Sequence, residues 1–279
     1  MAIRITTLVE NSSGEHLGLI HEHGLSFLIE KDNRTYLFDT GQSDAIIKNA
    51  RKLQLDLFQA DKIIISHGHY DHSGGVRSLL QSGGPSFQPE FILHNDFFNP
   101  KYSLQGSRSE YLGSDFDQQT LEDHNCVMRN FNSDIEEIEP GVWVVGNFLR
   151  YHTEETINDR FRLLTDEGLI LDDFRDEIML VVSSPKGLIL IMGCAHPGIM
   201  NMIDTVRERI GENIHAILGG THLVEARDRQ LDAAIEYLNN LKCDAIGVSH
   251  CTGNRVMEKL SRIDPRFFHN RTGSSLIIS

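Results

Sequence analysis

Four side chains that bind metals well stand within six residues of this sequence, at His67, His69, Asp71 and His72. They follow directly after the apolar run 62–66, which predicts a buried strand that ends in a short loop. Neutral imidazoles and a carboxylate suit zinc, iron or manganese better than calcium. Because His67 and His69 can share one ion while Asp71 and His72 reach a second, this spacing predicts a dinuclear metal site.

The strands and helices that position this loop are predicted from the apolar runs, which fall into two similar halves. In the first half we expect helices at 45–53 and from 75 onward, and strands at 2–8, 25–30, 35–38, 62–66 and 91–94. In the second half we expect helices at 202–210 and 229–241, and strands at 178–182, 188–192, 214–218 and 245–249. Three strands of the second half end at Gly or Ser followed by a histidine, which suits a site at one edge of a sheet.

The metal loop, with Ser73-Gly74-Gly75 after it and the strand-like segment 36–41 before it, resembles the metallo-β-lactamase superfamily. Further segments are similar to one branch of it, the metal-dependent hydrolases related to the dihydropterin ribofuranosylaminobenzene-phosphate synthase of methanopterin biosynthesis. These segments are 22–26, 193–198, 219–223 and 250–253. The resemblance implies an α/β (α+β) fold, the αββα four-layer sandwich of two mixed β-sheets flanked by helices.

The remaining metal ligands must come from the later strand ends, because each ion needs a further ligand. We expect His196 to join His67 and His69, and His250 to join Asp71 and His72. Where the superfamily has a Gly-Asp-Thr whose aspartate bridges the metals, this chain has Gly193-Cys194-Ala195. The superfamily's upstream His-Thr-Pro-Gly-His motif is also missing. Either Cys194 binds metal, or a water alone bridges the ions and His196 serves as a ligand; we favour the second.

Other residues are expected around the metals. His222, on the strand between those of His196 and His250, is a predicted catalytic residue together with Asp71. It would protonate a leaving group or hold a phosphate oxygen, or else act only as a more distant hydrogen-bonding residue. Asp39 is expected to orient one metal-binding histidine, and the resemblance implies that His23 faces the pocket. The other histidines are expected to be structural or at the surface: His16, His21, His94, His124, His152, His215 and His269.

Two segments lack a clear period and are predicted to be irregular insertions of a single domain, 1–279. Residues 97–135 and 152–177 would carry part of the substrate pocket or a lid, or would be solvated decorations. Four basic residues are candidates for binding an anionic substrate, with solvated surface charges as the alternative: Lys101, Arg108, Arg129 and Arg150.

The composition limits the classes of partner that we expect. A formal net charge of -14 argues against nucleic acid, since phosphate backbones need a basic surface. No apolar run approaches the roughly 18 residues of a membrane span, and the first residues do not resemble a signal peptide. We therefore expect a cytoplasmic protein with a small-molecule, anionic substrate. None of the four cysteines, at 126, 194, 243 and 251, forms a Cys-x-x-Cys pair.

The function predicted from these residues is that of a dinuclear-metal-dependent hydrolase or phosphoryl-type transferase. A metal-held hydroxide would attack a phosphate ester, phosphodiester or pyrophosphate-bearing small molecule, and the branch resemblance implies a pterin-related substrate as one option. The cofactors would be two divalent ions, zinc first, with manganese or iron as alternatives. Two other functions stay open: an iron-dependent oxidoreductase, and a ligand-binding sensor that retains metal with little turnover.

Overall fold

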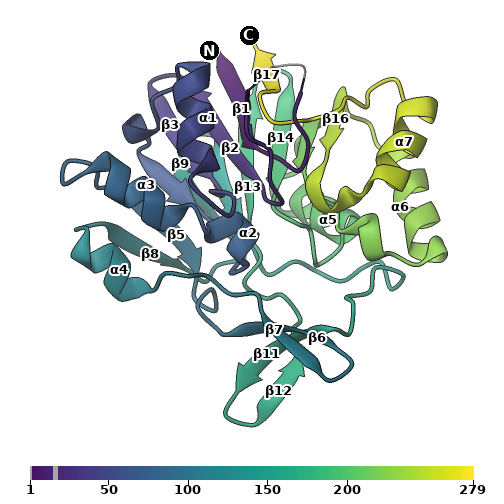
Figure 1. Cartoon of the computed structure of the whole chain (residues 1–279). Coiled ribbons are helices and arrows are strands. Elements are labelled where there is room, and N and C mark those ends of the chain that lie inside the picture. The colour runs from purple at the N-terminus through teal and green to yellow at the C-terminus, as the bar shows by residue number, and fades with distance from the viewer. Residues whose placement is uncertain (1, 15–17) are drawn as a thin grey trace. The chain divides into compact units, whose positions relative to one another are not determined.

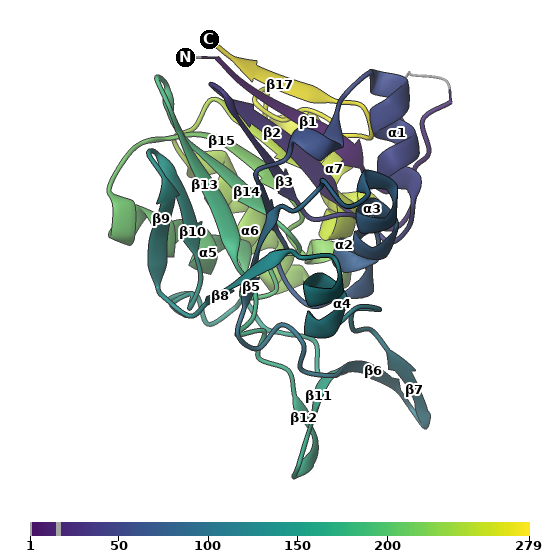
Figure 2. The same cartoon turned by 90° about the vertical axis from the view of Figure 1, so that its left-hand side faces the viewer.

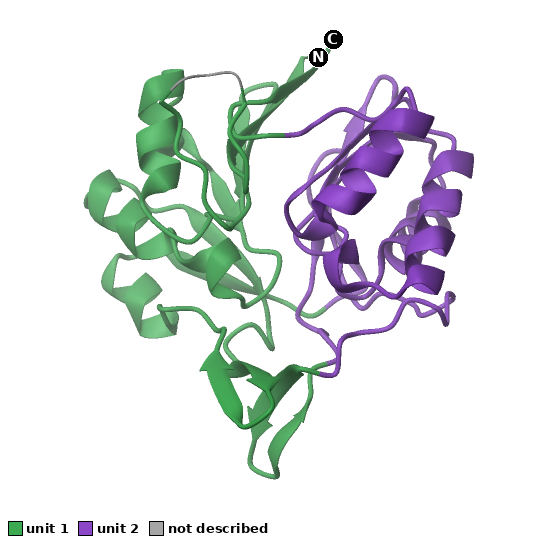
Figure 3. Ribbon diagram, turned by 45° about the vertical axis from the view of Figure 1, so that its right-hand side comes forward, with its two compact units in different colours: residues 1–132, 160–172, 271–279 green, residues 133–159, 173–270 purple. Residues whose placement is uncertain are grey.

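The structure, a computed structural model, describes residues 2–14 and 18–279 (Figure 1). His16 lies outside these residues, so its expected place is not described. The chain divides into two compact units (Figure 3). Unit 1 comprises residues 1–132, 160–172 and 271–279, and unit 2 comprises residues 133–159 and 173–270. Within the described ranges, every helix is too short or too polar to cross a lipid bilayer.

Unit 1 contains a seven-stranded mixed sheet in the order β17-β1-β2-β3-β4-β5-β8. Strands β17 to β3 pair antiparallel, and β3 to β8 pair parallel. The strands are β1 (Ile3–Val9), β2 (Ser26–Lys31), β3 (Arg34–Phe38), β4 (Lys62–Ile64), β5 (Glu90–His94), β8 (Val127–Phe131) and β17 (Ser275–Ile278). Because β3, β4 and β5 run parallel, the residues that follow them meet at one edge of the sheet.

Helices α1 (Ala45–Leu53) and α3 (Val76–Gly83) pack on one face of this sheet (Figure 2). Ile46 and Leu79 join Leu37 and Ile63 in one buried cluster, as expected from amphipathic helices. Alternate strand residues such as Phe38 point away from these helices and are also fully buried. Strands buried on both faces read as continuous apolar runs, which is why the sequence predicted them. The remaining helical segments of unit 1 are η1 (Leu57–Gln59), α2 (Tyr70–Ser73) and α4 (Gln118–Asp123).

Unit 1 also contains a small antiparallel sheet in the order β12-β11-β6-β7. Its strands are β6 (Lys101–Gln105), β7 (Arg108–Tyr111), β11 (Phe161–Thr165) and β12 (Gly168–Leu171). They lie in the two segments that the sequence predicted to be irregular. The strands are short, β7 is exposed throughout, and much of β12 is exposed, so no regular alternation marks them.

Unit 2 contains a six-stranded mixed sheet in the order β16-β15-β14-β13-β10-β9. Its helices α5, α6 and α7 supply residues such as Ile203, Leu238 and Leu260 to a buried cluster with Val181 and Leu190 of the sheet. The strands are β9 (Ile135–Glu139), β10 (Val142–Val145), β13 (Met179–Ser184), β14 (Gly187–Met192), β15 (Ile214–Gly219) and β16 (Ala245–Val248). The helical segments are α5 (Ile199–Ile210), η2 (Leu223–Glu225), α6 (Asp228–Asn240), η3 (His250–Thr252) and α7 (Asn254–Ile263).

The elements predicted from the apolar runs are confirmed, with ends shifted by a few residues. Directly after β5, residues 95–98 form a turn. The Asp96 backbone N–H donates to Nδ1 of His94 over 3.1 Å, and Phe97 turns into the core. His94 therefore stabilises a turn, which agrees with a structural role.

Candidate metal centre

The metal loop of unit 1 is held at the end of β4 by Asp39, which directly follows β3. Asp39 Oδ1 accepts the Ser66 backbone N–H over 2.7 Å, and Oδ2 accepts the Ser66 hydroxyl over 2.9 Å. The backbone of Asp39 is left-handed, with φ 59°, and its carbonyl accepts the Ser26 hydroxyl. All three side chains are fully buried. The Asp39 carboxylate thus fixes the backbone at Ser66, directly before His67.

His67 and His69 present nitrogen atoms to the same point. His67 Nε2 lies 3.1 Å from His69 Nδ1, while His67 Nδ1 is held 2.9 Å from the Ser66 hydroxyl. Two nitrogens about 2.0–2.1 Å from a tetrahedral zinc ion lie roughly 3.3 Å apart. Burial, followed by the nearby His72 and His69, holds the pKa of His67 well below its usual value, so its imidazole is neutral and can donate a lone pair. This donor set fits a transition-metal ion.

His72 shows the same division of its two ring nitrogens. Its Nδ1 lies 2.6 Å from Oδ2 of Asp39, and its Nε2 lies 3.6 Å from Oδ2 of Asp71. A carboxylate that accepts from Nδ1 leaves Nε2 as the lone-pair donor. Asp71 and His72 lie together on the short helix α2, so both donors come from one turn of backbone.

His23 lies beside Asp71, with Nε2 of His23 3.2 Å from Oδ2 of Asp71. The loop that carries it is anchored by Glu22, whose carboxylate accepts the backbone N–H groups of Gln42 and Ser43. Gly24 is needed next to it, because a Cβ there would lie 2.7 Å from the Asp71 carbonyl oxygen. The resemblance implied a pocket position for His23, and the structure places it against a predicted metal ligand.

In unit 2, Cys194 and His196 follow β14 as predicted. The backbone N–H groups of Ala195 and His196 donate to the buried carboxylate of Glu177 over 2.5 and 2.8 Å, which holds Ala195 in a left-handed conformation with φ 57°. Phe174 stacks on the His196 imidazole at a centroid separation of 3.6 Å. The His196 ring is therefore fixed on one face.

His222 follows β15, which lies between β14 and β16 as the sequence predicted. Its ring centroid is 4.2 Å from that of His196. Ligand atoms of His222, Cys194 and Cys251 all lie within 4.8 Å of one another. The Cys251 sulfur accepts the His222 backbone N–H over 3.2 Å and donates to the Cys194 carbonyl over 3.4 Å. Cys251 thus lies among the predicted residues, although no role was predicted for it.

The charge states of these groups depend on one another. Burial lowers the pKa of His222, but hydrogen bonds with Cys251 and Glu225 outweigh burial and raise it to about 9. Burial raises the pKa of the Cys251 thiol, but hydrogen bonds with Cys194 and His222 and the nearby His250 hold it well below its usual value. His250 itself opens the turn η3 directly after β16 and is buried.

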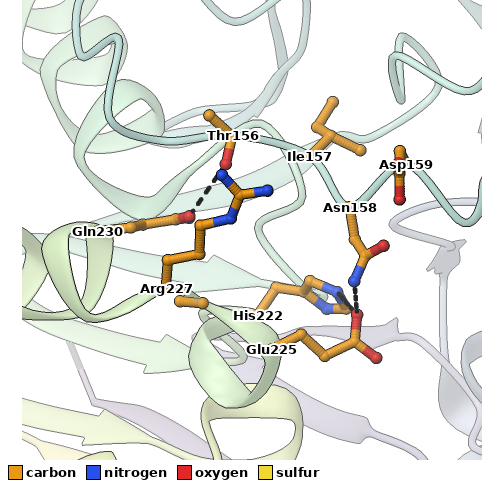
Figure 4. Close-up of a pocket in the computed structure, with 9 residues that line it drawn as sticks. Thr156, Ile157, Asn158, Asp159, His222, Glu225, Arg227 and Gln230 are labelled. Atoms are coloured by element: carbon orange, nitrogen blue, oxygen red, sulfur yellow. Dashed lines mark hydrogen bonds and ion pairs between the residues drawn. The ribbon is translucent and has the colours of Figure 1, made fainter.

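A cavity of about 310 Å³ adjoins His222 within unit 2 (Figure 4). Residues 156–159 form one wall, and residues between His222 and Gln230 form the other. Glu225 Oε2 lies 3.7 Å from His222 Nε2 and accepts the Asn158 amide over 3.0 Å. Residues 156–159 belong to the segment 152–177, which the sequence predicted to line the pocket. No individual role was predicted for Asn158 within it, and Glu225 was not predicted at all.

The four basic candidates for substrate binding differ in their surroundings. Lys101 is buried and lies 3.1 Å from Asp172, so it is not a solvated charge. Arg129 pairs with Glu90 over 2.8 Å. Arg150 donates to the carbonyl oxygens of Pro197 and Asp173, and Arg108 is exposed.

Two of the histidines expected to be structural pair with carboxylates: His152 with Asp204 and His215 with Asp244.

Comparisons with known proteins identify the family of the chain. The model of the metallo-β-lactamase superfamily matches residues 21–152. The chain is 32% identical to the 7,8-dihydropterin-6-methyl-4-(β-D-ribofuranosyl)-aminobenzene-5'-phosphate synthase of Methanocaldococcus jannaschii, over 92% of this chain and 91% of the relative. It is 31% identical to the solved structure of Tm1679, a metal-dependent hydrolase of the β-lactamase superfamily, with a TM-score of 0.85 and 99% of each chain covered. The chain belongs to the metallo-β-lactamase superfamily.

Membership in the metallo-β-lactamase superfamily confirms the resemblance drawn from the sequence, including the branch of the synthase. It also confirms the fold class, and each unit contains a mixed sheet with helices packed against it. Zinc-bound PqqB of Methylobacterium extorquens shares this fold at 10% identity, with a TM-score of 0.57 and 99% of each chain covered. Folds of this superfamily bind divalent metals, and the described histidines and carboxylates suit such ions.

Proposed function

We propose that this protein is a divalent-metal-dependent hydrolase or phosphoryl-type transferase that acts on a phosphate-bearing small molecule. The observation that carries the proposal is the donor set of unit 1. His67 and His69 aim nitrogen atoms at one point, and Asp39 holds the tautomer of His72 beside Asp71. We propose that two ions, zinc first and manganese or iron otherwise, are held by this set together with His196 and His250, as the sequence predicts.

The relative's activity supports the substrate class. Its name describes a synthase whose product carries a dihydropterin and a ribofuranosyl 5'-phosphate. We therefore propose that the substrate is anionic, phosphorylated and pterin-related, and that the enzyme is cytoplasmic. The four cysteines are free of disulfides, which suits a reducing compartment. Hydrolysis and group transfer differ only in whether water or another nucleophile attacks, so one site serves either reaction.

The chain's own residues would divide the work. Divalent ions, when bound, supply a water of lowered pKa and polarise the oxygen under attack. Asp39 keeps the His72 proton on Nδ1, so that Nε2 stays a lone-pair donor. His222, beside Glu225, would give a proton to the leaving oxygen. Glu225 would orient that imidazole and stabilise its positive charge.

Hydrolysis of bis(4-nitrophenyl) phosphate by protein loaded with zinc or manganese tests the proposal. We expect turnover that is abolished by a chelator and that falls about 100-fold or more in Asp71→Asn. His269→Gln, which changes an exposed histidine, is the control and should leave turnover unchanged. Folded, metal-loaded protein without turnover on phosphodiesters and phosphate monoesters would favour the sensor. Activity that appears only with iron and an oxidant would favour the oxidoreductase.

A further inference from the structure

The cavity beside His222 has the size of a site for part of a substrate. Its volume of about 310 Å³ equals that of roughly 10 water molecules at about 30 Å³ each, and it falls at the lower end of ligand pockets, about 300–1,000 Å³. The whole lining comes from unit 2, and His222 is the one predicted catalytic residue in it. None of the six predicted metal ligands lines it. The cavity is therefore distinct from the metal ligands and shares a wall with the predicted proton donor.

The cavity has two chemically different ends (Figure 4). At one end, the Glu225 carboxylate is engaged by the Asn158 amide and lies near His222. At the other end, Arg227 lies beside Thr156 and Gln230, whose side chains are 3.4 Å apart. The first end is occupied by an internal network, whereas the second offers a guanidinium, a hydroxyl and an amide.

The side chains of Lys101, Arg129 and Arg150 are engaged by other residues, whereas that of Arg227 is engaged by none of the described residues. In the part of the chain that the structure describes, its guanidinium makes no hydrogen bond and no ion pair. Its backbone is nevertheless fixed as the N-cap of α6, since its carbonyl accepts the Leu231 N–H over 3.0 Å. A guanidinium offers five N–H donors in a planar fork that matches the oxygens of a phosphate. A fixed backbone and a guanidinium that no other described residue engages suit a residue that binds an anion.

We propose that Arg227, flanked by Thr156 and Gln230, binds a phosphate monoester group of the substrate. This group is not the one that reacts. The remainder of the substrate extends through the cavity toward His222, so that Arg227 selects substrates with a second, distal phosphate. This inference rests on the proposed function, because it assigns a part of that site to one group of the substrate.

Equilibrium binding tests the inference without turnover. Calorimetry of the zinc-loaded protein should show binding of ribose 5-phosphate and much weaker binding of ribose. Arg227→Gln should weaken ribose 5-phosphate binding about tenfold or more, as the loss of a charge-assisted pair implies, and Arg227→Lys should restore part of it. Arg229→Gln is the matched control, because Arg229 is an exposed arginine on the same helix outside the cavity lining.

Each alternative outcome is informative. Equal affinity in wild type and Arg227→Gln would overturn the inference and would place the phosphate elsewhere, for example at the metal ions. An equal loss in Arg227→Gln and Arg229→Gln would mean a diffuse charge effect and would also overturn it, as would undetectable binding to the wild type at millimolar concentrations. If ribose 5-phosphate binds through Arg227 while no phosphodiester is hydrolysed, the inference stands and the proposed reaction fails.

Discussion

Asp39 and His72 form a buried pair whose atoms Oδ2 and Nδ1 lie 2.6 Å apart, with neither side chain exposed. The same carboxylate also accepts both the N–H and the hydroxyl of Ser66. One side chain from the end of β3 therefore sets both the backbone of the metal loop and the tautomer of one of its ligands. Asp39 thus supports His72 directly and His67 through the Ser66 hydroxyl, although it need not itself touch a metal.

Replacing Asp39 by Asn should weaken metal binding without removing a ligand. An amide has only one accepting oxygen, so it cannot accept the Ser66 N–H at one atom and the Ser66 hydroxyl and His72 Nδ1–H at the other, and the His72 tautomer is no longer enforced. Loss of such a partner typically costs about 10–100-fold in metal affinity. Competition with a chromogenic chelator measures this affinity, and Asp44→Asn, at an exposed ion pair with Lys48, is the control. An unchanged affinity in folded Asp39→Asn would exclude this role for Asp39.

Removal of the charge of Lys101 should destabilise the small sheet of unit 1. Lys101 Nζ and Asp172 Oδ2 lie 3.1 Å apart and both residues are 1% exposed. Lys101→Met leaves a buried carboxylate without its cation, which typically costs about 3–5 kcal/mol in the free energy of unfolding. The double variant Lys101→Met/Asp172→Asn should recover part of this loss.

Urea unfolding measures these free energies, with Lys48→Met as the control. Lys48 forms an exposed ion pair, for which about 0–1 kcal/mol is expected. If Lys101→Met cost no more than Lys48→Met, the buried pair would have no structural importance.

The stability of the metal-free protein should fall in mild acid because of His67. Burial, followed by His72 and His69, holds the pKa of His67 well below 6.5 in the folded protein. Below about pH 6.5 the unfolded chain binds a proton here that the folded protein does not, so the free energy of unfolding decreases as the pH falls. Above that pH both states are neutral and the full stability is present.

Urea unfolding above and below pH 6.5 measures this dependence, and His67→Gln should reduce it. Substitution of the exposed His269 by Gln should leave it unchanged. An identical pH dependence in wild type and His67→Gln would show that His67 does not titrate as its burial requires.

Gly220 should not tolerate a side chain. A Cβ there would lie 2.5 Å from the Cys251 sulfur and 2.6 Å from the Gly193 carbonyl oxygen. Such overpacking typically costs about 1–3 kcal/mol, and it would also displace the Cys251 sulfur from the His222 backbone N–H. We therefore expect Gly220→Ala to lower both the unfolding free energy and the turnover.

The control is Gly211→Asn, at the end of α5. A Cβ at Gly211 meets nothing within 4 Å, and Asn tolerates its left-handed conformation. If Gly220→Ala were as stable and active as Gly211→Asn, the prediction that the close packing around Cys251 excludes a side chain at position 220 would be wrong.

Local patterns were sufficient to predict the metal loop and the strands before it. His67 to His72 are close in sequence, and Asp39 follows an apolar run of the kind that forms a buried parallel strand. The order of β14, β15 and β16 followed from three apolar runs that each end before a histidine. In all these cases the informative residues are neighbours along the chain.

Contacts between distant segments could not be predicted in this way. Asn158 meets Glu225 across 67 residues, and Cys251 meets Cys194 across 57. The pairing of β6 with β11 joins two short strands with mixed burial, whose side chains leave no regular period. Glu225 had one local signal, its place three residues after His222, but a carboxylate at that spacing is common on any helical turn.

Elemental analysis of the protein, purified without added metal or chelator, tests the central claim most directly. We predict two equivalents of divalent metal per chain, zinc first and manganese or iron otherwise, and a clear loss in His67→Gln but not in His269→Gln. Less than one equivalent in folded wild-type protein, even after incubation with all three metals, would contradict the dinuclear site and the function proposed from it.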